Sequence, residues 1–565
     1  MEITIFLLLK TLAVAFIVYK LGWFAIHYHH ARRSGLPIYV VPVFSKSTLW
    51  LVLATALQPQ LQKLLPEFLY DRIDVLIHGW EFRRGRWYHD RLGSTFVVVT
   101  PDEFTVWCAD PIMGNTILQK RNEFQQAPIV SNILGFLGPN VFMYPINRRT
   151  AMSGEFSQSI PIKKPLLQCS SRKSRKRHRR MFNTNLDERI SRVVWNESHQ
   201  QAQAMVEYLE NNPGNGTLEG LRNIAINVIG KAGYNWEQKW SPTDFDIPAK
   251  NATGKEAYFG MLGLVTSMIL EAALLPRKIM KLPFMPIAIQ SMGYHLERAP
   301  QYIHEILRDE RQSNQNKTSS ENNFLSLMLE FSEEKHDSEA KSPLTQEEIN
   351  GNLFVFFPLV LKLQPTRWVL LWIQEEIRSL GTSDFTSEYE KVFPKCRRIL
   401  ALMFETLRLY TPVGHSTRAI FNPTSVAGAD GHTYHLTPPV DIYVEQSIIH
   451  LDPEIWGSDV NEFRPSRWLD DSGSLITMAK GHFLPWSGGP RVCPGVRFSQ
   501  VEFVATILTL FRSSRCVPLA LPGDSSSDPF LKLQSIVRDP VTKLTLQVKN
   551  PKEVYLKWTR CDKMI

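Results

Sequence analysis

One cysteine in a loop rich in glycine and proline constrains this chain most. The segment at 483–498 reads FLPWSGGPRVCPGVRF, and apolar residues at helical spacing follow it directly. Gly488, Gly489 and Gly495 let the backbone approach a flat object closely, and the start of a helix stabilises a thiolate. A buried free cysteine is the simplest alternative. The order of aromatic residue, glycines, arginine and cysteine favours instead a thiolate at Cys493 that binds a ligand.

This segment resembles the haem-binding loop of the cytochrome P450 family, whose pattern is F-x-x-G-x-R-x-C-x-G. Trp486, Gly489, Arg491, Cys493 and Gly495 stand at the five defined positions. Tryptophan replaces phenylalanine, but it keeps an aromatic wall beside the sulfur. The resemblance implies a haem cofactor with Cys493 as the metal ligand and Arg491 as a partner of a haem carboxylate. A thiolate ligand favours cleavage of an iron-bound O–O bond.

Two further segments match the same family. Glu405 and Arg408 lie three residues apart in an amphipathic helix, which alone would suggest a solvated ion pair of little consequence. Many apolar neighbours indicate that this helix is buried, where a charge pair needs partners. The segment FRPSRW at 463–468 resembles the F-x-P-x-R-W pattern of the family. The resemblance implies a structural triad of Glu405, Arg408 and Arg467.

Two arginines are predicted to bind the haem propionates by the same resemblance. Arg418 lies in GHSTRAI, and Arg179 lies in the basic run RKRHRR at 175–180. Arg175 stands where the family has a tryptophan. The basic run could instead be a nuclear-localisation or nucleic-acid patch. A predicted membrane anchor and the lack of interleaved aromatic residues argue against a nucleic-acid partner.

The fold predicted from these patterns is mostly α with a smaller β part, a cytochrome P450 fold behind an N-terminal transmembrane helix. The chain of 565 residues shows no internal repeat, which favours one catalytic domain over 34–565. Strands are expected at 94–100 and 441–445, and a short helix at 324–331. Polar residues at 311–323 and 333–343 predict surface loops. The apolar stretch at 49–57 is expected to pack against the protein.

Residues 1–33 are predicted to form the membrane anchor and its basic flank. The apolar run at 3–26 is long enough to cross a hydrocarbon core of about 30 Å at about 1.5 Å per residue. Only Lys10 and Lys20 interrupt this run, and Arg32 and Arg33 follow it. Positive charge after a span places the remainder on the cytosolic side. We therefore expect a single-pass protein, in the endoplasmic reticulum membrane, with its catalytic domain facing the cytosol.

The distal helix departs from the family, which carries an A-G-x-(D/E)-T-T stretch there. This chain has GNLFVFF at 351–357 and then PLVLKLQPTRW at 358–368, with Pro365 breaking the helix. No catalytic residue is assigned, since the acid and threonine pair is absent. One possible set of codons for 358–368 yields Ala-Gly-Phe-Glu-Thr-Thr in a shifted frame. We therefore interpret 358–371 as a gene-model error, and 144–176, which resembles nothing in the family, as retained intron.

The resemblance implies a monooxygenase that inserts one oxygen atom from O2 into a lipophilic small molecule, in the manner of fungal enzymes of secondary metabolism. No GxGxxG dinucleotide motif follows a strand, so electrons must come from elsewhere. The resemblance implies a separate NADPH-dependent reductase as their source. The net charge of +9 agrees with an acidic partner or an anionic membrane face. Two alternatives stay open. One is a haem-thiolate isomerase or dehydratase, and the other is a haem-binding protein that does not activate O2.

Overall fold

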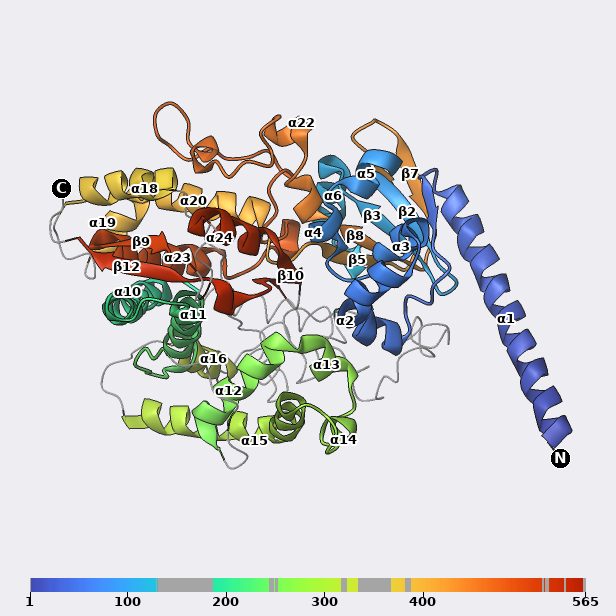
Figure 1. Ribbon diagram of the computed structural model, residues 1–565, viewed down its shortest axis with the longest axis horizontal. Coiled ribbons are helices and arrows are strands. Elements are labelled where there is room, and N and C mark those ends of the chain that lie inside the picture. Colours follow the sequence, from blue (N-terminus) through green and yellow to red (C-terminus); the bar gives the residue numbers. More distant parts are fainter. Residues whose placement is uncertain are drawn as a thin grey trace.

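A computed structural model describes residues 2–128, 130, 186–242, 248, 252–316, 323–333, 367–381, 388–520, 523, 528–542 and 545–561. The described part is mostly helical with a smaller β part, as the sequence predicts. The main sheet lies on one side of the molecule and the longer helices lie on the other (Figure 1).

The main sheet has six strands in the order β1-β2-β3-β8-β5-β4. Its strands are β1 (Ile38–Val40), β2 (Thr95–Val99), β3 (Phe104–Cys108), β4 (Gln125–Gln126), β5 (Ser416–Ile420) and β8 (Val440–Val444). β2 and β3 are antiparallel neighbours, and every residue of both strands is buried. β8 pairs with both β3 and β5, so strands from distant parts of the chain share one sheet. The strands predicted at 94–100 and 441–445 are confirmed as β2 and β8.

The protein also has smaller β elements and short helices outside the main sheet. Three two-stranded sheets are β6 (Thr424–Ala427) with β7 (Thr433–Leu436), β9 (Ser514–Pro518) with β12 (Leu556–Arg560), and β10 (Pro540–Thr542) with β11 (Leu546–Val548). The short helices include α2 (Thr48–Leu64), α3 (Glu67–Asp74), α4 (Trp80–Arg84), α5 (Trp87–Leu92), α6 (Pro111–Gln119), α19 (Tyr389–Val392), α21 (Gln446–Ile449), α22 (Pro453–Trp456) and α24 (Pro529–Arg538).

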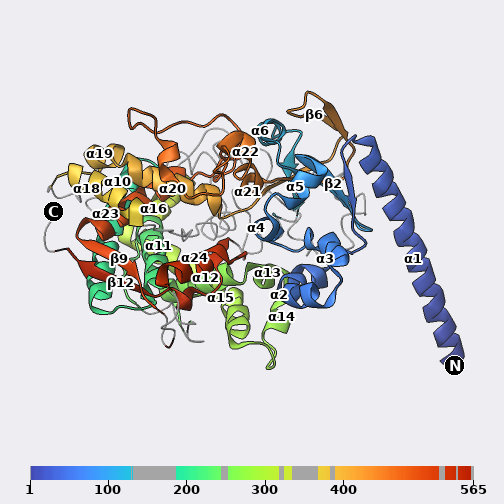
Figure 2. The same ribbon diagram turned by 45° about the horizontal axis from the view of Figure 1, so that its top comes forward.

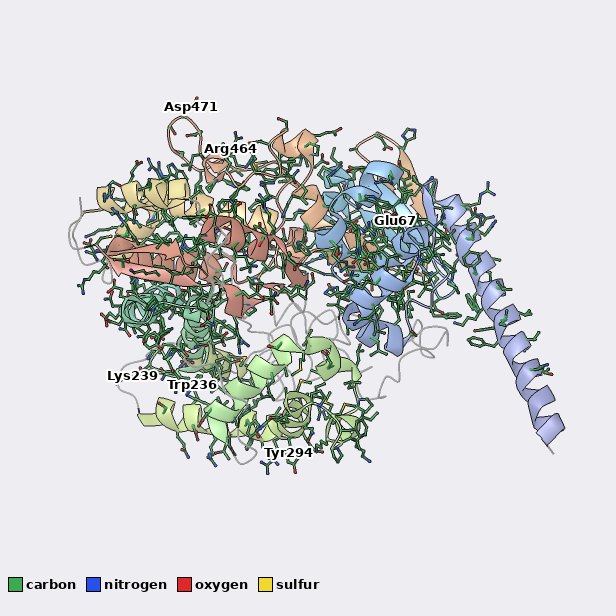
Figure 3. The ribbon with its side chains drawn as sticks, in the orientation of Figure 1. Glu67, Trp236, Lys239, Tyr294, Arg464 and Asp471 are labelled. Atoms are coloured by element: carbon green, nitrogen blue, oxygen red, sulfur yellow. The ribbon has the colours of Figure 1, made fainter. Side chains whose placement is uncertain are left out.

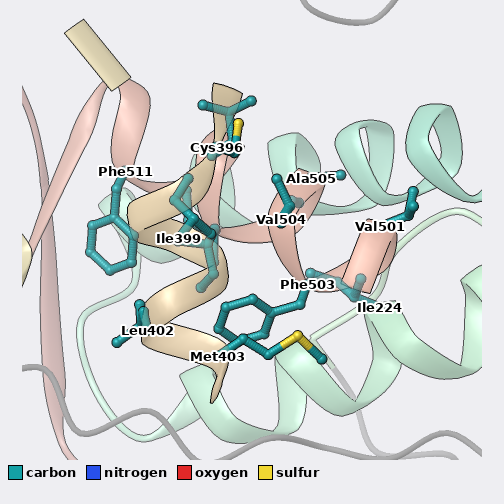
Figure 4. Packing of buried hydrophobic residues seen from close by; sticks show 14 of the residues in the cluster. Ile224, Cys396, Ile399, Leu402, Met403, Val501, Phe503, Val504, Ala505 and Phe511 are labelled. Carbon is teal, nitrogen blue, oxygen red and sulfur yellow. The ribbon is translucent and has the colours of Figure 1, made fainter. Parts of the chain in front are cut away.

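The remaining helices, both long and short, form most of the rest of the protein. They are α10 (Glu188–Asn211), α11 (Gly216–Tyr234), α12 (Gly254–Ser267), α13 (Ile269–Leu274), α14 (Arg277–Met280), α15 (Ile287–Asn316), α16 (Phe324–Glu333), α18 (Arg367–Ser379), α20 (Arg397–Leu409) and α23 (Val496–Arg512). α20 and α23 cross in the largest apolar cluster, where Ile399, Met403 and Phe503 are buried together (Figure 4). Close packing of this cluster fixes α20, which carries Glu405 and Arg408, relative to α23, which directly follows the segment of Cys493.

Helix α1 (Glu2–Arg33) projects away from the sheet side of the protein (Figures 1 and 2). From Lys20 onward it is attached to the sheet: the Lys20 ammonium lies 2.7 Å from the Asp102 carboxylate, and buried Ala31 packs in the cluster beside β2 and β3. Within the described residues, no helix combines the length and the apolar character needed to cross a membrane. The predicted transmembrane span at 3–26 is therefore not confirmed.

Two boundaries differ from the predictions, and two predictions agree. α15 continues to Asn316, so the segment predicted as a loop from 311 begins as helix, because a helix that is held by its earlier turns can continue through polar residues. The predicted short helix at 324–331 is confirmed as α16, which extends to Glu333. The apolar stretch at 49–57 packs as part of α2, with Ala54 buried beside Tyr70 and Ile77.

Asp441 gives the sheet a pH dependence that can be measured. This carboxyl is buried on β8, and burial raises its pKa to about 6 from its ordinary 3.8, against the opposing effect of nearby Lys46. The folded state thus holds this proton more tightly, and the contribution of Asp441 to the free energy of unfolding falls as the pH rises from about 4 to about 6, by at most about 1.4 kcal/mol per pH unit. Urea unfolding across this range should lose this contribution in Asp441→Asn, so that the free energy of unfolding of the variant has a more positive slope against pH than that of the unmodified protein.

Asp471→Asn is the matched control for this experiment, because Asp471 lies exposed on a surface loop (Figure 3). The control should keep the slope of the unmodified protein. Equal slopes for Asp441→Asn and the unmodified protein would contradict the prediction.

Candidate functional site

A fully buried ion pair joins Glu405 and Arg408 on α20. The Arg408 Nε and Nη2 atoms donate hydrogen bonds of 2.9 Å each to the Glu405 Oε2 and Oε1 atoms. Both side chains are completely excluded from solvent. The helical spacing of three residues places them on one face, and the planar guanidinium matches both carboxylate oxygens at once.

The segment at 463–468 completes the coordination of the Glu405 carboxylate. Arg467 Nε donates to Oε1 at 3.0 Å, and Trp468 Nε1 donates to Oε2 at 2.9 Å. The backbone N–H of Arg464 adds a third donor, 2.9 Å from Oε1. The structure therefore places the three residues of the predicted triad in contact. It also adds two donors, from Trp468 and Arg464, that the sequence analysis did not identify.

The two arginines of this network are held by further acceptors. Arg408 Nη1 donates to the backbone carbonyls of His450 at 3.0 Å and Val460 at 2.7 Å. Arg467 pairs with the Asp459 carboxylate at 3.2 Å. The side of this segment that faces solvent carries Arg464, whose side chain is exposed (Figure 3). Burying these charges is costly, and dense hydrogen bonding of this kind offsets that cost.

The Cys493 loop spans 483–495 and leads into α23. The Cys493 N–H donates to the Trp486 carbonyl at 2.9 Å, which folds the loop back on itself. Gly489 has φ +64°, and a Cβ atom there would lie 2.4 Å from the Leu118 carbonyl oxygen, so only glycine fits. Gly495 precedes the first turn of α23, so the half-buried Cys493 sulfur lies close to the positive end of that helix.

Trp486 links the Cys493 loop to its surroundings. Its Nε1 atom donates to Ser499 Oγ on α23 at 3.2 Å. Its ring meets Phe404 edge-on at 6.1 Å between centroids, and Phe404 in turn meets Trp468 at 5.4 Å. An aromatic chain therefore connects the loop with the Glu405 network. The tryptophan at this position fills the place of the family's phenylalanine with one additional hydrogen bond.

Arg418 lies on β5, next to the Cys493 loop. Ser416, on the same strand, has its Oγ 2.9 Å from Ser487 Oγ in the loop. The Arg418 guanidinium is buried and donates to the Thr417 carbonyl at 2.9 Å, while no acidic side chain of the described residues forms an ion pair with it. Burial alone lowers its pKa to about 10. A buried cation of this kind fits a carboxylate ligand, as a haem propionate would be.

The structure places the predicted site residues in three groups. Trp486, Gly489, Arg491, Cys493 and Gly495 share one loop, Glu405, Arg408 and Arg467 share the buried network, and Arg418 lies on the strand beside the loop. Arg179, the segment 144–176 and residues 358–366 lie outside the described residues. Residues 367–371 are described and begin α18.

Comparison with known proteins agrees with this geometry. The family model described as cytochrome P450 matches residues 146–358 and 389–538. These two ranges cover more than half of the chain, and the chain belongs to the cytochrome P450 family. Members of this family bind haem, so haem is the cofactor of the class to which this protein belongs.

Several fungal relatives match over nearly their whole length. A phomenoic acid biosynthesis cluster cytochrome P450 monooxygenase of Leptosphaeria maculans is 26% identical over 88% of this chain and 90% of the relative. Cytochrome P450 monooxygenase prx9 of Penicillium rubens is 23% identical over 90% of each chain. A cytochrome P450 monooxygenase of Arthrobotrys oligospora is 24% identical over 92% of this chain and 93% of the relative. These matches support an oxidoreductase of the monooxygenase class.

Glu405→Gln tests the role of the buried network. The amide keeps the size of the side chain but leaves two buried guanidinium groups beside a neutral partner. We expect the free energy of unfolding, measured with urea, to fall by about 3–5 kcal/mol.

Glu375→Gln is the matched control, because the Glu375 carboxylate also pairs with an arginine, Arg398, at 2.7 Å, while its side chain is 61% exposed. The control should lose about 1 kcal/mol or less. Similar losses in both variants would contradict the structural role of Glu405.

Proposed function

We propose that this protein is a haem-thiolate monooxygenase in which Cys493 holds the iron and a lipophilic small molecule receives one oxygen atom from O2. The observation that carries the proposal is the Cys493 loop, with a half-buried sulfur at the start of α23 and a glycine backbone pressed against Leu118. The position of the sulfur favours the thiolate form, because the dipole of the helix stabilises negative charge there.

Each predicted site residue has a defined part in this proposal. Cys493 would ligate the iron, while Arg418, Arg491 and Arg179 would bind the propionates. Trp486 would shield the sulfur from water. The haem, when bound, supplies the binding and activation of O2. The residues of this chain hold the cofactor, fix its orientation and keep the thiolate dry.

The partners of the proposed reaction follow from the family. Electrons would come from an NADPH-dependent reductase that meets the proximal side near Cys493. Membrane attachment, at the endoplasmic reticulum with the catalytic part in the cytosol, is supported by α1, on which Val14, Ile17 and Val18 are exposed apolar residues. Secondary metabolism is the proposed setting, since one relative is named for the biosynthesis cluster of phomenoic acid.

The distal part of the site rests on the reading frame at 358–371. The family match stops at 358 and resumes at 389, which supports our proposal that the printed sequence departs from the family there. The first matched range begins at 146 and runs through most of 144–176, for which we keep the proposal of retained intron. The coding DNA tests the first proposal directly: codons at 358–368 that cannot yield A-G-F-E-T-T in the shifted frame would refute it.

Cys493→Ser tests the iron ligand. Since a serine hydroxyl is a far weaker ligand for the iron than a thiolate, we expect the purified variant to lose most of its haem, together with the thiolate signature in the ferrous carbonyl spectrum. Cys561→Ser is the matched control, because Cys561 is also a half-buried free cysteine but lies after β12, near the end of the chain. Normal haem content and an unchanged spectrum in Cys493→Ser would overturn the assignment.

NADPH consumption separates the proposed function from its two alternatives. The protein reconstituted with a fungal reductase should consume NADPH when a lipophilic substrate is added, and oxygen from labelled O2 should enter the product. Turnover of a peroxide or an oxime without reductase would favour an isomerase or dehydratase. Haem binding without any substrate-dependent NADPH use would favour a non-catalytic haem protein, and repeating the assay with the frame restored would test whether the distal segment is the cause.

A further inference from the structure

His450 lies between the Glu405 network and the Cys493 loop. It follows α21 directly and is completely buried. Its backbone carbonyl accepts the hydrogen bond of 3.0 Å from Arg408 Nη1. Its ring reaches two other segments: Nδ1 lies 2.8 Å from Thr411 Oγ1 after α20, and Nε2 accepts the Leu484 N–H at 2.8 Å. One residue therefore contacts the network, the end of α20 and the beginning of the loop.

The hydrogen bonds fix the protonation of this ring. A backbone N–H can only donate, so Nε2 must carry no proton and must accept from Leu484. Nδ1 then carries the proton and donates to Thr411 Oγ1. The Thr411 hydroxyl in turn donates a hydrogen bond of 2.7 Å to the Leu407 carbonyl. Both ring nitrogens of His450 and the Thr411 hydroxyl are therefore hydrogen-bonded. This pairing requires a neutral imidazole, because a protonated Nε2 could not accept the Leu484 N–H.

Burial and charge keep the ring neutral. Burial, supported by the nearby Arg408 guanidinium, lowers the pKa of His450 to about 3. The ring packs against Phe483 at 5.2 Å and against the edge of Trp456 at 6.4 Å between centroids. These contacts leave it one orientation, with Nε2 directed at the first turn of the loop.

The bond to Leu484 acts where the loop begins to fold. The Leu484 carbonyl accepts the Ser487 N–H at 2.9 Å, and this turn brings Trp486 to the position where its carbonyl accepts the Cys493 N–H. Ser487 has a positive φ of 63°, which a residue other than glycine adopts only when its surroundings enforce it. A displacement at Leu484 would therefore be passed through this turn to the sulfur.

We propose that His450 is a positioning residue, which uses its neutral imidazole to hold the Cys493 loop in register with the Glu405 network. The proposal rests on the proposed function in that Cys493 is taken as the iron ligand. Leucine fills a comparable volume without an acceptor. Glutamine reaches as far as Nε2 and offers an amide oxygen to Leu484, whereas the shorter asparagine reaches only as far as Nδ1 and can serve Thr411 alone.

These differences define a three-variant experiment on the full chain: His450→Gln, His450→Asn and His450→Leu. The first readout is hydrogen exchange of the peptide covering 483–493, which needs no bound haem. We expect exchange about tenfold faster in the Asn and Leu variants, because both lose the buried hydrogen bond that the Leu484 N–H donates to His450. The Gln variant should exchange at nearly the rate of the unmodified protein. The peptide from α10 lies outside the hydrogen bonds of His450, so its exchange rate should be unchanged in all three variants.

The second readout is the ferrous carbonyl spectrum, which separates thiolate from thiol ligation of the iron. The Asn and Leu variants should show a larger thiol fraction than the Gln variant at equal haem content. Loop exchange that is unchanged in Asn and Leu, equally accelerated in α10, or as fast in Gln as in Leu would overturn the role of His450. If Cys493→Ser instead keeps its haem, the assignment of the ligand fails, while the exchange data still decide whether His450 positions the loop.

Discussion

The Glu405 carboxylate is the charge on which the proximal half of this structure depends. It is fully buried and receives donors from two arginines, one tryptophan and one backbone N–H. A lone carboxylate at this depth would cost several kcal/mol, so the donors must be brought to it as the chain folds. Two of the five bonds come from Arg408 on the same helix, and the other three come from Arg464, Arg467 and Trp468 in the segment at 463–468. The result is a fixed distance between α20 and the segment at 463–468.

The position of the Cys493 loop depends on the buried network around Glu405. Trp486 reaches the network through Phe404 and Trp468, and Leu484 reaches it through His450. On its other side, the loop is limited by the close approach of Gly489 to the Leu118 carbonyl. Apolar packing of α23 against α10 and α20 holds the end of the loop. Contacts at Leu484, Trp486 and Gly489 and at the following helix thus hold the loop at 483–495 in place, as a reproducible geometry at the proposed metal ligand requires.

Much of this arrangement was predictable from the sequence, because short motifs reflect contacts between residues that are close in the chain. Glycines at 489 and 495, the helix that follows Cys493, and the spacing of Glu405 and Arg408 all express contacts between near neighbours. Strand β2 was predictable because an apolar run of β-branched residues has few other solutions. The role of His450 could not be predicted from the sequence, since its partners Thr411 and Leu484 lie far away in the chain and no sequence pattern distinguishes a buried histidine.

The N-terminal helix α1 is an element for which the sequence pattern did not predict the tertiary contacts. Its composition predicts a membrane span, but composition does not reveal that Lys20 forms an ion pair with Asp102, or that Ala31 packs beside the sheet. Such contacts are decided by the tertiary fold, and a helix can be apolar for half of its length and docked for the other half. The α15 boundary has the same origin, since a helix that is held by its earlier turns can continue through polar residues on an exposed face.

The buried charges of the Glu405 network and of Arg418 differ in whether an acidic side chain of the described residues balances them. The Glu405 network is complete within the chain, with each arginine bonded to protein acceptors. Arg418 is different: it is buried beside the loop with a backbone carbonyl as its acceptor, and burial lowers its pKa. The side of the proposed site that holds Cys493 is thus fixed by internal bonds, while Arg418 on β5 is a buried cation whose charge the carboxylate of the proposed ligand would balance.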